Sequence, residues 1–262
     1  MTIEIFQIDA FTDKVFGGNS AAVCPLKAWL PDAHLQKIAL ENNLAETAFF
    51  VRESSNTYHL RWFTPEIEMD LCGHATLATA MVIFNYFEPA EKAIHFHTHS
   101  GTLSVTKQGN LFEMDFPSRP PIRANLPLII KEALNIQPVE VWKSRDYLLV
   151  YNSEEDIRNL APDQSIINQI NLDPGGIIVT SRGATVDFVS RFFTPQASIF
   201  EDPVTGSAHC TLVPFWSQRL EKKNMDALQL SNRKGQLFCS LKGDRVFIKG
   251  KAVLYLRGEI TI

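Results

Sequence analysis

The sequence contains two residues whose types suit proton transfer. His74 follows Gly73 in the segment CGHAT, and histidine can carry a proton because its ordinary pKa lies near neutrality. Glu46 lies in LAETAFF, between a helix-like run and an apolar strand, where partial burial would suit an acid–base carboxyl group. Each residue also has a structural interpretation, because histidine often caps or packs a helix start and glutamate is commonly exposed. The residue types leave both interpretations open.

A second set of residues suits the binding of a small anion. Gly73 and Gly206 stand near the starts of two predicted helices, whose unpaired backbone N–H groups attract carboxylates. Glycine lets these groups approach a ligand closely, and the Ser207 hydroxyl can donate to a carboxylate oxygen. Asp202 precedes Pro203, which is also the ordinary pattern of a helix N-cap followed by proline. We therefore expect a small anionic metabolite, with the N-cap interpretation of Asp202 still open.

Other candidate residues are less suited to metal binding or to nucleophilic catalysis. His95, His97 and His99 alternate along a predicted strand and share one face, but no fourth metal ligand with a matching spacing is visible. We therefore predict no metal. The four cysteines form no CxxC pair, which is typical of reduced thiols. Cys72 and His74 are two residues apart, and residues so spaced on a helix do not face each other, so no thiol–imidazole pair is expected.

The composition argues against several classes of function. The chain has 262 residues, 45% of them hydrophobic, and a formal net charge of −4, so it has no basic excess for nucleic acid. No apolar run reaches the roughly 18 residues that a membrane span needs. The first residues lack the basic and small-residue flanks of a signal peptide. We therefore predict a cytoplasmic protein with neither a nucleic-acid nor a membrane partner.

The first half of the chain is predicted to place many strands around one buried helix. The segment 73–87 is apolar on nearly every face, so a helix there must be enclosed by other elements. Residues 31–43 predict an amphipathic helix that ends at the Asn42-Asn43 pair. Alternating or β-rich segments predict strands at 3–11, 47–51, 57–63, 93–99, 101–109 and 111–117.

The second half is predicted to have the same organisation. A proline-rich stretch near 117–127 interrupts all periodicity and indicates a boundary between domains 1–118 and 119–262, although the last strand could return to the first domain. A short polar helix is expected around 153–160. Strands are predicted at 139–144, 147–152, 176–181, 187–193 and in a closing series from 228 to 262.

An internal repeat supports this division into halves. The sequence RWFTP at 61–65 matches RFFTP at 191–195, an offset of 191 − 61 = 130 residues. Seven residues beyond each proline come Cys72 and Asp202, and each begins a small-residue segment that opens an apolar, helix-like run. Pro214 lies inside the second of these helices and is expected to kink or shorten it.

Three separated motifs, LAETAFF, LCGHAT and EDPVTGSA, carry a resemblance to a known family. In these motifs the chain resembles the PhzF-like family of phenazine biosynthesis over essentially its whole length. The resemblance implies an α+β fold of two similar lobes, each a mixed β-sheet or barrel curled around a central α-helix, as in diaminopimelate epimerase. It also implies an active site between the lobes and assembly as a homodimer.

The resemblance further implies an isomerase that moves a proton without metal or cofactor. Glu46 would be the acid–base residue, and His74 and Asp202 would assist proton handling and hold polar substrate groups. The carboxylate site would be lined by Gly73, Gly206 and Ser207.

One departure from the family pattern is Ser20, because the family often has proline after the preceding Gly-Gly-Asn. Two alternatives stay open. One is a two-base amino-acid epimerase with a thiol on each side of the substrate carbon, for which only Cys72 lies at a matching place. The other is a binding module for a small anion that has no turnover.

Overall fold

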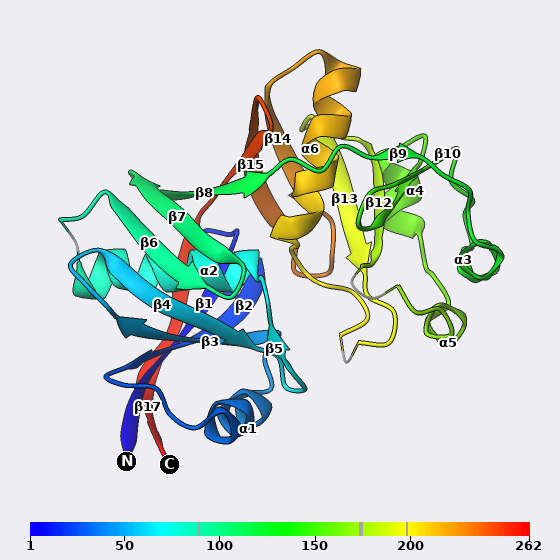
Figure 1. The fold of residues 1–262 in the computed structure, drawn as a ribbon. Coiled ribbons are helices and arrows are strands. Elements are labelled where there is room, and N and C mark those ends of the chain that lie inside the picture. Colours follow the sequence, from blue (N-terminus) through cyan, green and yellow to red (C-terminus); the bar gives the residue numbers. More distant parts are fainter. Residues whose placement is uncertain (89, 173–174, 198) are drawn as a thin grey trace. The chain divides into compact units, whose positions relative to one another are not determined.

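The structure is a computed structural model with a mixed α and β fold, in which strands outnumber helices (Figure 1). It divides into two compact units, of which unit 1 comprises residues 1–116 and 248–262 and unit 2 residues 117–247. The last strand therefore belongs to unit 1, which is the alternative that the sequence left open beside a domain of residues 119–262. The residues that the structure describes are 1–88, 90–172, 175–197 and 199–262.

Unit 1 is a mixed sheet whose strands pair in a fixed order. The pairs β2–β3 and β4–β6 are parallel and the others are antiparallel, and a helix spans each parallel connection. The order is β17 (Ala252–Thr261), β1 (Thr2–Ala10), β2 (Asn19–Leu26), β3 (Glu46–Arg52), β4 (Thr57–Phe63), β6 (Ala93–Thr98), β7 (Gly101–Gln108) and β8 (Leu111–Pro117), with the short β5 (Glu68–Met69) on β4.

The central helix of unit 1 is enclosed, as its apolar pattern predicts. All ten residues of α2 (Gly73–Val82) are buried, and the helix packs against β1, β2, β3 and β17. It continues as the π-helix η1 (Ile83–Phe87). The amphipathic helix α1 (Asp32–Asn42) covers another part of the sheet through Leu35 and Ile38, and it ends where Asn43 takes a left-handed conformation. Both predicted helices are confirmed, with α1 one residue shorter at each end than the range 31–43 and the range 73–87 shared by α2 and η1.

Unit 2 repeats the pairing pattern of unit 1. From β10 to β15 the pairs are antiparallel, parallel, antiparallel, parallel and antiparallel, as they are from β1 to β7 with β5 left aside. The strands are β9 (Ile122–Arg123), β10 (Glu140–Lys143), β11 (Tyr147–Val150), β12 (Ile177–Arg182), β13 (Phe188–Phe193), β14 (Asn224–Gln229), β15 (Gly235–Lys242) and β16 (Arg245–Gly250), which runs into unit 1. The helices are α3 (Leu128–Ala133), α4 (Glu154–Asn159), α5 (Gln164–Ile167) and α6 (Gly206–Leu220).

Two of the helices in unit 2 are missing from the sequence prediction. These are α3 and α5, with six and four residues, which are too short to show helical periodicity. They bury Ile130 and Ile167 in the core of unit 2, which also contains Leu149 and Val179. Among the described residues, no helix combines the length and apolar character needed to cross a membrane.

The expectation that Pro214 shortens its helix is wrong. Helix α6 runs through Pro214 and has 15 residues, compared with ten in α2. Proline lacks the N–H that would normally bond to the carbonyl oxygen four residues earlier, here that of Cys210. The backbone N–H of Arg119 donates to that oxygen at 2.9 Å. A strand-linking segment far away in sequence therefore supplies the missing donor.

The enclosure of α2 leads to a stability prediction. Leu77→Ala should lower the free energy of unfolding by about 2–5 kcal/mol, because it removes a fully buried side chain and leaves a cavity. Leu40→Ala is the matched control, since Leu40 lies on α1 and is 58% exposed. This substitution should change the free energy of unfolding by less than about 0.5 kcal/mol. Urea denaturation measures both. Similar losses in the two variants would contradict the enclosed position of α2.

Candidate active site

The two predicted acid–base residues are in contact in unit 1. Glu46 is the first residue of β3 and His74 the second of α2, and the packing of α2 on β3 brings them together. The distance from Glu46 Oε2 to His74 Nε2 is 2.9 Å. The side chains are 15% and 5% exposed, so Glu46 is not the exposed strand-start residue of the structural interpretation. His74 is also not the helix cap, because Cys72 occupies that position.

The other ring nitrogen of His74 has two neighbours. Its Nδ1 lies 3.1 Å from Asn19 Nδ2 and 3.5 Å from Cys72 Sγ. The expectation that residues 72 and 74 do not face each other is wrong, because Cys72 is the N-cap, with φ −140° and ψ 110°, and lies outside the helix. Sequence reasoning missed Asn19, whose one available signal was its place in the Gly-Gly-Asn-Ser segment.

Burial and neighbouring charge act on this cluster in opposite directions. Burial disfavours a charged ring, but the proximity of Cys72 and Glu46 outweighs it and raises the pKa of His74 well above its usual range. Burial, together with the charge of Glu46, raises the pKa of the Cys72 thiol to about 11. A positive charge in the cluster is therefore best tolerated on the imidazole.

The same three residues are the group of described side chains that could hold a metal ion. Ligand atoms of Glu46, Cys72 and His74 lie within 4.8 Å of one another. However, Nε2 faces the carboxylate and Nδ1 faces the thiol, and a single ion binds only one nitrogen of a ring. The three side chains are therefore better arranged to carry protons than to bind one metal ion together.

The three histidines in and directly after β6 contact separate partners. His95 Nδ1 lies 2.9 Å from the Ser104 hydroxyl, and His97 Nδ1 lies 2.7 Å from Glu53. His99 lies 3.7 Å from Glu68. Within the part of the chain that the structure describes, they do not form a group with metal-ligand distances.

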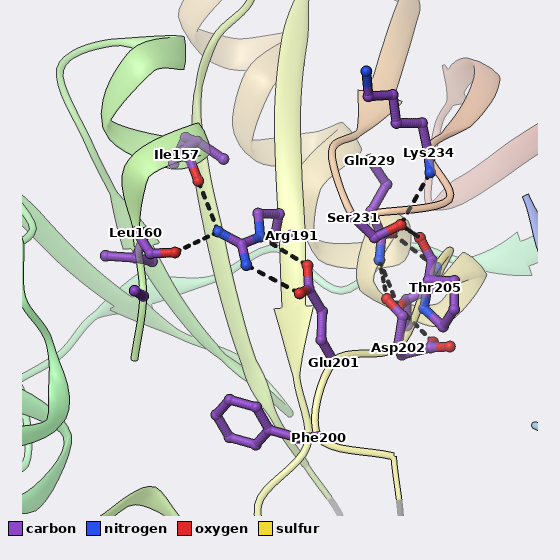
Figure 2. Close-up of polar contacts among 12 residues, drawn as sticks. Ile157, Leu160, Arg191, Phe200, Glu201, Asp202, Thr205, Gln229, Ser231 and Lys234 are labelled. Carbon is purple, nitrogen blue, oxygen red and sulfur yellow. Dashed lines mark hydrogen bonds and ion pairs between the residues drawn. The ribbon is translucent and has the colours of Figure 1, made fainter. Parts of the chain in front are cut away.

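Asp202 belongs to a hydrogen-bonded loop that leads into α6 (Figure 2). Its carboxylate accepts the Thr205 hydroxyl at 2.6 Å. Thr205, not Asp202, is the N-cap of α6, which corrects the N-cap interpretation of Asp202. By position at the helix start, Thr205 is the counterpart of Cys72. Gly206 and Ser207 are the first two residues of α6, as Gly73 is the first of α2.

Gln229 holds this loop from the end of β14. Its Oε1 accepts the Thr205 backbone N–H at 2.8 Å, and its Nε2 donates to the Asp202 carbonyl at 2.8 Å and to the Thr205 hydroxyl at 3.1 Å. Gln229 is fully buried, so each of these bonds replaces one to water. No motif in the sequence marks this residue.

The repeated arginines clamp the loops that follow their strands. Arg191 on β13 makes a two-pronged ion pair with Glu201, with distances of 2.7 and 3.0 Å, and also donates to the carbonyl oxygens of Ile157 and Leu160 (Figure 2). Arg61 on β4 is held in the same way by Glu68. The arginines of the two FTP segments therefore have a structural role. They fix the loops that lead to the starts of α2 and α6.

His209 is a second buried histidine that sequence reasoning missed. It is completely buried in α6, and its Nδ1 donates to the Thr205 carbonyl at 2.8 Å. Burial lowers the pKa of His209 to about 4, so the ring is neutral near pH 7.

With this geometry in place, the chain can be compared with known proteins. The family model described as phenazine biosynthesis-like protein matches residues 8–258. The chain belongs to this family. A curated relative, an uncharacterized isomerase of Pseudomonas aeruginosa, is 50% identical over the full length of both chains. The family predicted from three motifs is confirmed, and the relative's name agrees with the predicted reaction class.

Solved structures support the fold. The crystal structure of a PhzF-family protein from Enterococcus faecalis is 47% identical, with a TM-score of 0.95 and complete coverage of both chains. A hydroxyproline epimerase from Agrobacterium vitis has a TM-score of 0.62 at 8% identity, covering 99% of this chain and 92% of its own. This second likeness concerns the fold alone, which the phenazine biosynthesis-like proteins share with an epimerase.

The contacts of Gln229 lead to a stability prediction. Gln229→Leu should lower the free energy of unfolding by about 1–3 kcal/mol, because it leaves a buried N–H and a buried carbonyl without partners. Gln236→Leu on the exposed face of β15 is the control and should have little effect. Thermal or urea unfolding tests both. If Gln229→Leu left the free energy of unfolding unchanged, the loop would not depend on this side chain.

The lowered pKa of His209 leads to a pH prediction. Because the ring binds a proton at about pH 4 when folded but near 6.5 when unfolded, stability should fall as the pH drops through this window. The loss should reach up to about 3 kcal/mol and should be absent in His209→Gln. Urea titrations from pH 7 to pH 4 measure it, with exposed His34→Gln as control. Parallel pH curves for wild type and His209→Gln would contradict the prediction.

Proposed function

We propose that the protein is an isomerase that moves a proton on a small carboxylate-containing metabolite, with Glu46 as the acid–base residue. Membership of a family with isomerase-named relatives supports the reaction class. The observation that carries the assignment of Glu46 is its 2.9 Å contact with the buried His74. A buried carboxylate beside an imidazole is held ready to take up and return a proton.

The proposed step needs no group beyond the chain and the substrate. The Glu46 carboxylate removes a proton from a carbon next to an activating group, and the bonding electrons remain on the substrate as a delocalised anion. The protonated Glu46 then returns the proton to the same carbon or to a conjugated one.

The remaining site residues keep the roles that the resemblance implies. Gly73 and Gly206 begin α2 and α6, where backbone N–H groups without helical partners can bind a carboxylate. The Ser207 hydroxyl and Asp202 would hold polar substrate groups. A fold of two similar lobes, a cytoplasmic location and a homodimer are part of the same proposal and rest on the family resemblance.

A two-thiol epimerase finds no support among the described residues. The N-cap position of α6 that corresponds to Cys72 is taken by Thr205, whose hydroxyl is bonded to Asp202. Cys210 lies one turn further along α6 and is buried. A proton-transfer mechanism centred on one carboxylate agrees better with these positions.

Glu46→Gln should reduce proton exchange by about 10²- to 10⁴-fold, because it removes the acid–base group with little change in shape. NMR in D₂O with a panel of small unsaturated and amino carboxylic acids measures the incorporation of solvent deuterium at carbon. Glu53→Gln is the matched control, since Glu53 also pairs with a histidine, His97, at 2.7 Å. Its exchange rate should equal that of the wild type.

Two outcomes would contradict this proposal. Undiminished exchange in Glu46→Gln would remove Glu46 from its role. Binding of a panel member without any exchange by the wild type would favour a binding module over an enzyme.

A further inference from the structure

Strand β17 is the outer strand of the unit 1 sheet, and its outer edge is long. It lies beside β1, next to both chain ends, and the strand pairs of the described residues give it no partner on its other side (Figure 1). The backbone N–H and C=O groups of such an edge can pair with another chain. Proteins commonly protect an edge by keeping it short or by placing proline or lysine on it, but β17 has ten residues and contains neither.

Hydrogen bonds at the chain ends fix which backbone groups of β17 point outward. The backbone N–H of Ile262 donates to the Met1 carbonyl at 2.9 Å, and the Met1 amino group donates to the Ile262 carbonyl at 2.5 Å. The register of β17 with β1 is unbroken from here to Arg257, and bonded and non-bonded pairs alternate along an antiparallel pair. Gly258 therefore bonds toward β1, whereas Arg257 and Glu259 direct their backbone N–H and C=O groups away from it.

Charge selects one register in which two copies of this edge can pair antiparallel. With a two-fold axis at Gly258, Arg257 lies opposite Glu259 of the second copy, and both residues present the outward backbone groups that such a pair needs. An axis at Arg257 or at Glu259 would instead place like charges opposite each other. Glu259 is exposed, and its neighbour on β1 is the like-charged Glu4, so an arginine from a second copy would supply the opposite charge.

The edge also has the room and the apolar surface that a second copy needs. On the axis, the two glycines would form a non-hydrogen-bonded pair, in which Cα atoms approach to about 4.5 Å. A Cβ atom added at Gly258 would meet only Leu256 Cδ2 within 4 Å, at 3.8 Å. Leu256 is 42% exposed and would lie opposite Ile260 of the second copy. Next to the edge, the exposed rings of Tyr255 and Phe16 pack at 5.7 Å.

We propose that two copies of this chain pair antiparallel through β17, with the two-fold axis at Gly258. The unit 1 sheets of the two copies then form one continuous sheet. The same surface patch meets itself, as in any two-fold interface. Arg257 pairs with Glu4 of its own chain at 2.8 Å and also faces Glu259 of the second copy. The inference assigns a surface to the homodimer and rests on that part of the proposed function, but it does not depend on the proton transfer.

Charge reversal tests the pairing, with sedimentation equilibrium of the full chain as the measurement. Arg257→Glu and Glu259→Arg should each raise the dissociation constant of the dimer by about tenfold or more, because each places like charges across the interface. An equimolar mixture of the two variants, and the double variant that carries both changes, should regain the dimer because opposite charges face each other again. Lys37→Glu, on the exposed side of α1, is the control and should leave the dissociation constant unchanged.

Cysteine cross-linking tests the register. Gly258→Cys should form a disulfide-linked dimer under mild oxidation, because the two copies of this position face each other within the Cα distance that a disulfide spans. Thr261→Cys is the control, since in this register its two copies lie about 20 Å apart and cannot be linked. The four natural cysteines are buried and do not compete.

Three results would overturn the pairing. A wild type that stays monomeric at the highest concentration measured would remove both the pairing and the homodimer. A dimer that Arg257→Glu leaves intact, or one that Thr261→Cys links and Gly258→Cys does not, would remove this surface and leave the homodimer. A folding defect in Arg257→Glu is distinguished by the double variant, which also lacks the contact with Glu4 but should dimerise. The deuterium experiment decides the role of Glu46 independently of all three.

Discussion

The candidate site depends on the burial of α2. Because this helix is apolar on every side, the sheet of unit 1 encloses it, and the first turn is removed from water along with the rest. His74 therefore finds its partners among protein groups: Glu46 from β3, Asn19 from β2, and Cys72 at its own helix start. In that low-dielectric setting, the contacts between charged groups are much stronger than they would be on the surface.

The two units share a frame but differ in what they place at the helix start. The pairing pattern, the arginine clamp and the glycine at the first helical position recur in both units. Unit 1 has Cys72 at the N-cap, beside a histidine and a glutamate. Unit 2 has Thr205 there, bonded to Asp202 and held by Gln229. The arginines and glycines that recur in both units have structural roles. The side chains at the two helix starts, which could take part in chemistry, differ between the units.

Residues distant in sequence complete the polar contacts of α6. Arg119 donates to the carbonyl that Pro214 leaves without its usual donor, and Gln229 satisfies the backbone before the first turn. Helix α6 can therefore contain a proline and still exceed α2 in length. Proline still removes one hydrogen bond from the helix. The backbone N–H of Arg119, in the segment after β8, offsets this loss by donating to the freed carbonyl.

The sequence by itself determined the elements that have a strong local pattern. Alternation predicted the strands, and the all-round apolar character of 73–87 predicted the enclosed helix. Three motifs identified the family and predicted Glu46, His74 and Asp202 as site residues. Tertiary structure alone decided their contacts, because the contact of Glu46 with His74 and the hydrogen bonds of Gln229 to Thr205 join residues with no local relation. It thus brought Cys72 to His74, made Thr205 the cap in place of Asp202, and supplied a donor for the carbonyl before Pro214.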